Sequence, residues 1–360
     1  MSRFSKSVLC SVAVLPIFTL ALTEAAHAAT SPLTGAEALN QFNLITLGNV
    51  NSNSHVDGRA WIGGSVSGGD YVQHTGSTPN SNYAGLTVMG SASNVHVNGL
   101  GSYIGGSFTN STVNSGSSYI GGAVGNSNLN GASYVVGGSN GTNFNGPRLS
   151  TPSALIQTNA SAAASTNFGT TLSTLSNTLK SAVANSTVSV VGNKATFNAV
   201  ANNKGVAVFD LNNITSASVF SAGEFSFAAN GASTIIINSS VSSAVIGANF
   251  LGGQAQSLAK SIVWNFYNAT SLTINNQFGG SILATRASLT NNQNIEGGVF
   301  VNSLTQNGEL HLQAFTGNLA AVAPVPEPEE YLLMVAGLVL VVGAAALRRR
   351  RVAASGMLAA

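Results

Sequence analysis

Apolar residues and glycines recur at an interval of sixteen residues in the first half of the chain. Four segments align so that each holds one apolar and one glycine position in register: TVMGSA (87–92), YIGGSF (103–108), YIGGAV (119–124) and VVGGSN (135–140). The apolar column is Val88, Ile104, Ile120 and Val136, and the glycine column is Gly90, Gly106, Gly122 and Gly138. A repeat this short, with β-branched stretches and glycine corners, does not suit a helical repeat and predicts one coil of a parallel β-solenoid.

Further columns keep the same interval: Val97, Val113 and Leu129; Asn98, Asn114 and Asn130; Asn94, Asn110 and Asn126. An earlier copy, HVDGRAWIGGSV (55–66), matches HVNGLGSYIGGSF (96–108), so the repeats run over about 55–146 with an insertion near 73–82. Coils stacked at about 4.8 Å would bury the apolar columns and turn the Asn98 column into an amide ladder. The alternative, a glycine-rich low-complexity tract, would not keep several columns in register.

The period changes after Pro152. Apolar residues then follow spacings of three and four, which mark one face of a helix: Ile156, Ala160, Ala164, Phe168, Leu172, Leu175, Leu179 and Val183. We predict one long helix over about 152–184, with Ser150 or Thr151 as its cap, Pro152 in its first turn and a weak point at Gly169. Its narrow apolar stripe favours packing along a solenoid flank. A helix that caps a separate domain is the alternative.

Strand patterns resume over about 187–317, separated by Asn and Gly turns. They are TVSVVG (187–192), GVAVFDL (205–211), STIIINSS (233–240), SIVWNFYNATSLTI (261–274), GSILATRASLT (280–290) and NIEGGVFVNSL (294–304). We interpret them as coils that stack on the first block. The predicted fold class is therefore mainly β, a discontinuous parallel β-solenoid (β-helix) with one long α-helix packed along its flank.

The first 28 residues have the parts of a secretory signal peptide. Arg3 and Lys6 precede an apolar run over 7–22, and Ala26 and Ala28 are the small residues that a signal peptidase reads. An uncleaved N-terminal membrane anchor is the alternative. The single cysteine, Cys10, lies in this segment, so the mature chain must be stable without disulfides.

Between residues 29 and 323 the chain carries seven acids and seven bases. This neutral body without a basic stripe argues against nucleic acid as a partner. Regularly spaced Val, Ile and Leu argue against disorder, which low charge alone would allow.

The chain ends in a proline- and acid-rich stretch, an apolar run and a basic cluster, after a linker at 318–324. As a helix, residues 331–347 would span about 25 Å, the lower limit for a bilayer core of about 30 Å. The basic cluster should stay in the cytoplasm, and it comprises Arg348, Arg349, Arg350 and Arg351. The motif that precedes the apolar run cannot continue a helix and would present an extended peptide at the outer membrane face: Val325, Pro326, Glu327 and Pro328.

This segment, 325–351, looks like a PEP-CTERM sorting signal. The resemblance implies that an exosortase, a membrane-embedded cysteine transpeptidase, cuts near Pro326. An inner membrane intermediate would then pass to the cell surface or extracellular matrix of a Gram-negative bacterium. The chain departs from the pattern because residues 352–360 follow the arginines. A plain tail anchor is the alternative.

The body, residues 37–317, resembles the choice-of-anchor A domain. The resemblance rests on FNLITLGNV (42–50), VDGRAWIGGSV (56–66), IVWNFYNATSLTI (262–274), GSILATRASL (280–289), NIEGGVFVNSL (294–304) and GELHLQAFTG (308–317). The chain departs at Thr285 and Arg286, where the family tends to have a proline and a small residue. The resemblance implies an adhesive module of a bacterial surface or secreted protein.

Few residues point to chemistry. His55 and His96 occupy equivalent repeat positions, which repetition explains better than a metal site. Asp57 and Asp70 are too few for a calcium site. No serine lies in a G-x-S-x-G turn with Asp and His partners, and the carboxylates are too scattered for a glycosidase pair. We therefore name no catalytic residue, no metal ligand and no cofactor.

Three functions remain. The first is an exported adhesin-like structural module that exosortase sorts, with extracellular polysaccharide or another surface as its partner. The second is a binder of ice or carbohydrate through a flat solenoid face, for which an outward threonine ladder is expected, whereas Asn and Ser dominate here. The third is a polysaccharide-active enzyme on a β-helix, which needs clustered carboxylates.

Overall fold

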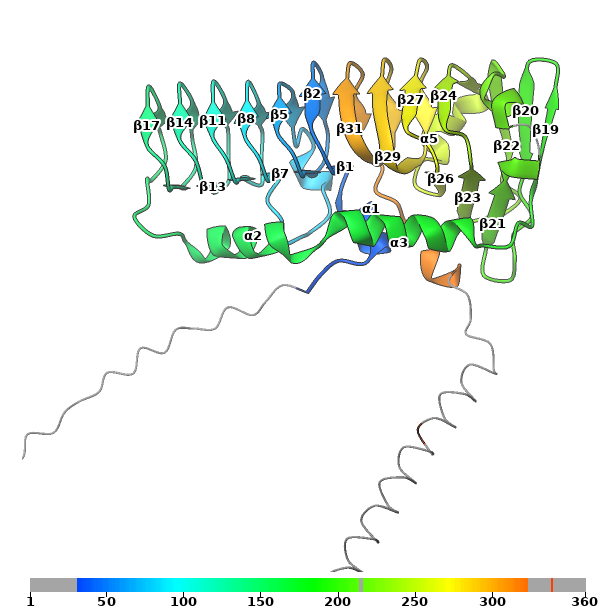
Figure 1. Cartoon of the computed structure of the whole chain (residues 1–360), viewed down its shortest axis with the longest axis horizontal. Coiled ribbons are helices and arrows are strands. Elements are labelled where there is room, and N and C mark those ends of the chain that lie inside the picture. The colour runs from blue at the N-terminus through cyan, green and yellow to red at the C-terminus, as the bar shows by residue number, and fades with distance from the viewer. Residues whose placement is uncertain (1–30, 214–215, 323–337, 339–360) are drawn as a thin grey trace, which may run out of the picture.

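The computed structural model describes residues 31–213, 216–322 and Leu338, and it forms one β-solenoid with helices along one side (Figure 1). Each coil of the N-terminal half contributes three short strands. Equivalent strands of successive coils pair in parallel and in register, so that Tyr103 pairs with Tyr119 and Ile104 with Ile120. The predicted fold class, a discontinuous parallel β-solenoid, is confirmed.

The first strand ladder lies against the helices, and we call it the helix face. Its N-terminal strands are β1 (Leu44–Thr46), β4 (Ala60–Ile62), β7 (Leu86–Val88), β10 (Ser102–Ile104), β13 (Ser118–Ile120) and β16 (Ser133–Val135). Its C-terminal strands are β21 (Val206–Asp210), β23 (Thr234–Ser239), β26 (Ile262–Phe266) and the first parts of β29 (Ser281–Asn291) and β31 (Val299–Gln306). The C-terminal strands are buried on both sides, which explains their continuous apolar runs.

The second ladder faces away from the helices, and we call it the hydroxyl face. Its N-terminal strands are β2 (Val50–Ser52), β5 (Val66–Ser67), β8 (Ala92–Ser93), β11 (Phe108–Thr109), β14 (Val124–Gly125) and β17 (Ser139–Asn140). Its C-terminal strands are β24 (Ser243–Ile246), β27 (Ser271–Ile274) and the second parts of β29 and β31.

The third ladder, the histidine face, is a separate sheet. Its strands are β3 (His55–Val56), β6 (Asp70–Tyr71), β9 (His96–Val97), β12 (Thr112–Val113), β15 (Asn128–Leu129), β18 (Asn143–Phe144), β28 (Phe278–Gly279), β30 (Ile295–Glu296) and β32 (Leu310–His311). A four-stranded sheet completes the C-terminal half with β19 (Thr187–Val191), β20 (Lys194–Asn198), β22 (Glu224–Ala228) and β25 (Asn249–Phe250).

The two halves of the solenoid meet in the middle of the stack. After β18 the chain returns along the helices to the far end, and the later strands build inward until β31 lies beside β1 and β2 (Figure 1). Leu44 pairs with Val299 and Val50 with Leu304. This seam makes one continuous solenoid from two segments far apart in sequence.

The predicted long helix over 152–184 is wrong in detail, because two helices occupy that range. They are α2 (Ala154–Ser165) and α3 (Phe168–Lys180), and the shorter helices are α1 (Gly35–Gln41), α4 (Ser216–Phe220) and α5 (Gln254–Ser257). The break falls at Thr166 and Asn167 rather than at Gly169, and Ser153, not Ser150 or Thr151, is the N-cap of α2.

The break has a physical cause at Thr166. Its hydroxyl oxygen accepts hydrogen bonds from the Tyr83 hydroxyl and from the backbone N–H of Leu33, both at 2.9 Å. Asn167 then caps α3, and Phe168 enters a cluster of aromatic rings with Trp61 and Tyr83. The flank position that the sequence predicted for the helix is confirmed.

A chain of buried amides fastens α3 to the sheet. The Ser176 hydroxyl donates to Asn265 Oδ1 at 2.6 Å, and Asn265 Nδ2 donates to Asn238 Oδ1 at 2.8 Å. Asn238 Nδ2 in turn donates to the Leu179 carbonyl at 2.7 Å. The three side chains of this chain thus each have a partner, which removes the desolvation penalty of an unpaired amide.

The repeat columns are confirmed except at their last member. The final coil is one residue shorter, so Ile120 pairs with Val135, while Val136 is 56% exposed. In the glycine column, a Cβ added to Gly137 would lie 2.5 Å from the backbone of Gly122, whereas Gly138 has open space. The members predicted from the sequence, Val136 and Gly138, are therefore wrong.

The two asparagine columns have different roles. Asn114 Nδ2 donates to Asn98 Oδ1 at 2.8 Å and Asn145 Nδ2 to Asn130 Oδ1 at 2.7 Å, an amide ladder on the surface of the histidine face. The members of the other column have left-handed backbones, with φ of 56°, 50° and 49° at Asn94, Asn110 and Asn126. They turn the chain from the hydroxyl face to the histidine face.

Replacing Ile120 with Asp tests the interior column. Ile120 is fully buried between Ile104 and Val135, so an unpaired charge there should cost several kcal/mol and unfold the N-terminal coils. Circular dichroism melting measures the loss. Asn130→Asp, an exposed change in the same coil, is the control and should leave the melting temperature nearly unchanged. An unchanged melting temperature for Ile120→Asp would contradict the assignment.

Two substitutions at Asn110 test the left-handed corner. Ala should cost roughly 1–2 kcal/mol, because a Cβ without a compensating side-chain bond disfavours this backbone region. Gly adopts positive φ freely and should cost less than Ala. The comparison is made by urea unfolding. Equal losses for Asn110→Ala and Asn110→Gly would show that the column does not act through backbone conformation.

Candidate functional site

The hydroxyl face presents two outward columns of small polar side chains. The register of the ladder aligns the first column as Ser243, Ser271, Ser288, Ser303, Asn49, Ser65, Ser91 and Ser107. It aligns the second column as Val245, Thr273, Thr290, Thr305, Asn51, Ser67, Ser93 and Thr109. Both columns cross the seam, so the face is shared by the two halves of the chain.

Strand geometry places these columns on a regular lattice. Between them lies an inward column that is buried in the core, with Leu304, Val50 and Val66 as neighbours across the seam. Because side chains alternate along a strand, residues two apart point outward about 6.6 Å from each other, and coils repeat at about 4.8 Å. The result is a flat grid of hydroxyl and amide groups.

Hydrogen bonds to the next coil hold the first column in place. Asn49 Oδ1 accepts from the Ser65 N–H at 2.8 Å, Ser65 Oγ from the Ser91 N–H and Ser91 Oγ from the Ser107 N–H, both at 3.1 Å. On the other side of the seam, the Ser303 hydroxyl donates to Ser288 Oγ at 2.9 Å. Side chains fixed before binding lose little entropy when a ligand docks.

The grid carries no charge, because every side chain in the two columns is Ser, Thr or Asn except Val245 at one end. A shallow depression runs between the columns at the centre of the stack, lined among others by Asn49, Asn51, Ser65 and Ser67. Each lining hydroxyl can both donate and accept a hydrogen bond. Such a surface suits an ordered neutral partner rich in hydroxyl groups or water.

The histidine face differs because acids and histidines alternate along it. Its outward column runs Glu309, His55, Asp70 and His96, and His96 Nδ1 lies 2.7 Å from Asp70 Oδ1. The neighbouring column places His311 beside Glu296. The face therefore satisfies its ionisable groups pairwise along the stack.

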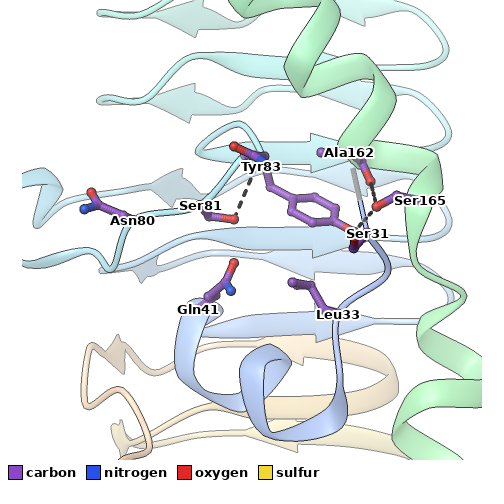
Figure 2. Close-up of a pocket in the computed structure, with 9 residues that line it drawn as sticks. Ser31, Leu33, Gln41, Asn80, Ser81, Tyr83, Ala162 and Ser165 are labelled. Carbon is purple, nitrogen blue, oxygen red and sulfur yellow. Dashed lines mark hydrogen bonds between the residues drawn. The ribbon is translucent and has the colours of Figure 1, made fainter. Parts of the chain in front are cut away.

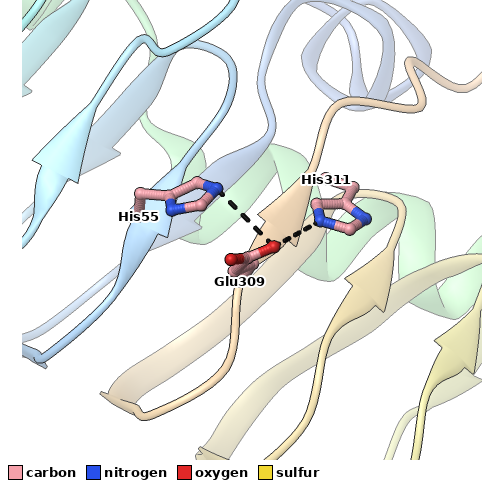
Figure 3. A group of neighbouring side chains, drawn as sticks. All are labelled: His55, Glu309 and His311. Atoms are coloured by element: carbon pink, nitrogen blue, oxygen red, sulfur yellow. Dashed lines mark hydrogen bonds and ion pairs between the residues drawn. The ribbon is translucent and has the colours of Figure 1, made fainter.

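Three of these side chains converge at the seam (Figure 3). Glu309 Oε2 lies 2.7 Å from His311 Nε2 and 3.8 Å from His55 Nε2, and His311 Nδ1 lies 2.7 Å from Oε1 of the buried Glu296. The hydrogen bond from His311 lowers the pKa of Glu309. Burial lowers the pKa of His311, but its bonds to Glu309 and Glu296 outweigh burial and raise it.

Sequence reasoning placed His55 and His96 in one column, and the structure shows that Asp70 lies between them. It did not single out Glu309 and His311 as their companions. A signal was present, because GELHL (308–312) stacks on SHVDG (54–58), so that an acid lies opposite a histidine in one segment and the reverse in the other. The seam pairing that brings them together cannot be read from the repeat.

A separate pocket lies where the insertion near 73–82 meets α1 and α2 (Figure 2). Tyr83, Ser165 and Gln41 line it, and no carboxylate, histidine or lysine is among its lining residues. Beside it the buried Arg59 holds the insertion by donating to the carbonyls of Pro79 at 2.8 Å and Tyr83 at 3.1 Å. Burial lowers the pKa of Arg59 to about 10, so it stays charged. Beside the pocket, Arg59 thus fastens the inserted loop to the solenoid.

The predicted processing and targeting residues lie outside the described residues: Ala26, Ala28, Val325, Pro326, Glu327, Pro328, Arg348, Arg349, Arg350 and Arg351. So does the apolar run 331–347, apart from Leu338. Within the described ranges, no helix has the length and apolarity that a membrane crossing requires. The signal helix and the transmembrane helix therefore stay predictions.

The chain matches the model of a protein family. A family model described as "Putative Ice-binding-like adhesive domain" covers residues 35–312, from α1 to the end of the last coil. No curated protein and no solved structure matches the chain.

Proposed function

Because the chain belongs to the ice-binding-like adhesive domain family, we propose that it is an adhesin-like surface module that holds extracellular polysaccharide through its hydroxyl face. The observation that carries this proposal is the uncharged grid of Ser, Thr and Asn side chains that crosses the seam. A neutral polysaccharide offers donors and acceptors at short, repeated spacing. Many weak contacts in register then add up to firm attachment.

The module acts by binding and not by catalysis. The columns of the hydroxyl face contain no carboxylate, histidine, lysine or cysteine, which are the groups that general acid–base and nucleophilic catalysis use. The acids at the seam are engaged by histidines on another face. The separation of the uncharged hydroxyl face from the acids of the histidine face supports a non-enzymatic role.

We further propose that the body is a choice-of-anchor A-like domain delivered by a PEP-CTERM signal. The signal peptide would export the chain, and the segment 331–347 would hold it in the inner membrane. An exosortase would then cut near Pro326 and release it to the cell surface or extracellular matrix of a Gram-negative bacterium. The order of the parts in 325–351 supports this route.

One observation favours ice as a second candidate ligand. Thr273, Thr290 and Thr305 are neighbours in one outward column, which is the threonine ladder that an ice binder needs. The column continues as Asn51 and Ser67, so its threonine stretch is confined to the C-terminal coils.

Ser93→Lys tests the hydroxyl face. A long charged side chain within the grid should prevent close contact and reduce binding to the host's own extracellular polysaccharide at least tenfold, measured by co-sedimentation. Thr112→Lys places the same side chain on the histidine face and should bind like the wild type. Equal binding by Ser93→Lys, or no binding by the wild type, would contradict the proposal. Inhibition of ice recrystallisation by the wild type, lost in Ser93→Lys, would favour ice.

Changing Pro326, Glu327 and Pro328 to Ala separates sorting from simple anchoring. The apolar run and arginines remain, so membrane insertion and orientation should persist. In a host with exosortase, the wild type should lose about thirty residues and reach the surface, as intact mass reports. The variant should stay full length in the inner membrane. Identical processing of the two proteins would exclude the sorting signal.

A further inference from the structure

The seam between the two halves carries an arrangement of side chains that adhesion does not require. His55 comes from β3 near the start of the solenoid, whereas Glu309 and His311 come from its last coil. One donor atom from each of these three side chains lies within 4.8 Å of the other two (Figure 3). Among the described residues, no other group of three histidine, cysteine or acidic side chains brings its donor atoms this close together.

The spacing of the donor atoms suits a metal ion. Two ligands about 2.1 Å from one tetrahedral ion lie about 3.4 Å apart. The observed separations from Glu309 Oε2 are 2.7 Å to His311 Nε2 and 3.8 Å to His55 Nε2. Small side-chain movements would equalise them.

A second carboxylate orients the metal-facing histidine. His311 Nδ1 lies 2.7 Å from Glu296 Oε1, so the other ring nitrogen, Nε2, is left to face Glu309. Glu296 is 1% exposed, and Gln277 Nε2 donates to the same oxygen at 2.8 Å. A carboxylate behind a histidine is the usual support of a protein metal ligand, because it fixes the tautomer and the ring.

An independent observation comes from Asp57. Its residue is 3% exposed, and its Oδ1 is buried without a hydrogen-bond partner, 3.5 Å from His55 Nε2. A buried carboxylate oxygen with no donor is costly unless a cation lies nearby. The other oxygen, Oδ2, accepts from the Leu312 N–H at 3.1 Å and lies 3.0 Å from His74 Nδ1, so Oδ1 is the oxygen that adds unpaired negative charge beside His55.

We propose that His55, Glu309 and His311 bind a divalent transition metal, with Zn²⁺ as the best fit, and that this ion pins the last coil to the first. Imidazole nitrogens with a carboxylate favour Zn²⁺ over Ca²⁺ and Mg²⁺, which prefer oxygen ligands. Asp57 adds negative charge beside the proposed site, 3.5 Å from His55 Nε2. Because the ligands come from both halves, the ion stabilises only the closed solenoid.

The test uses untagged full-length protein stripped of metal with a chelator. Isothermal titration with ZnCl₂ should show one site per chain. The melting temperature should rise by about 5 °C when free Zn²⁺ is about a hundredfold above Kd. Mg²⁺ at the same concentration should not raise it. Absence of Zn²⁺ binding would overturn the proposal.

Variants locate the site. His55→Gln and His311→Gln should each weaken Zn²⁺ binding at least tenfold and abolish the rise in melting temperature. His96→Gln is the matched control, because His96 lies in the same column as His55 but contacts only Asp70 among the histidine-face acids. Unaltered binding in both His55→Gln and His311→Gln would overturn the proposal. If either variant fails to fold, the visible absorption spectrum of Co²⁺ bound to the wild type is measured instead. The proposed ligands require the spectrum of a tetrahedral site with nitrogen and oxygen ligands, and any other spectrum would overturn the proposal.

Discussion

The parallel pairing of β31 with β1 and β2 is the contact on which the rest of the structure depends. It joins residues from opposite ends of the solenoid sequence, so a long loop must close before either half gains a neighbour on that side. Once it forms, the N-terminal coils extend the stack in one direction and the C-terminal coils in the other. The core, the hydroxyl grid and the histidine cluster all pass through it without interruption.

The repeat made much of the N-terminal half predictable, because identical residues such as Ile104 and Ile120 stack only in one register. Many of the C-terminal strands were also predictable from their apolar runs, although the antiparallel partner β20 and the strands β22, β24, β25 and β28 were missed. Three features were beyond sequence reasoning. The shortened last coil moved Val136 outward, the Thr166 hydroxyl broke the helix by bonding Tyr83, and the seam brought His311 to His55. Each depends on contacts between distant segments.

The three faces of the solenoid differ in the side chains that they present and in what covers them. The helix face is closed by α2 and α3 and holds a second apolar cluster that includes Phe168 and Trp61. The histidine face pairs ionisable groups, and the hydroxyl face is left uncharged and open to solvent. Within the core, Ser127 Oγ accepts from the Ser111 N–H at 3.2 Å, so this interior hydroxyl is paired along the stack. A neutral body without cysteine thereby reaches a continuous shape.

The return path through α2 and α3 ties the number of coils to the length of a helix. The pair runs beneath the stack from the N-terminal coils to β23 (Figure 1). A coil advances the stack by about 4.8 Å, and a helical residue advances by about 1.5 Å, so each added coil requires about three more helical residues. A gene that gains one sixteen-residue repeat must therefore also gain nearly one helical turn elsewhere. The combined length of α2 and α3 therefore limits how many coils such a chain can gain by duplication.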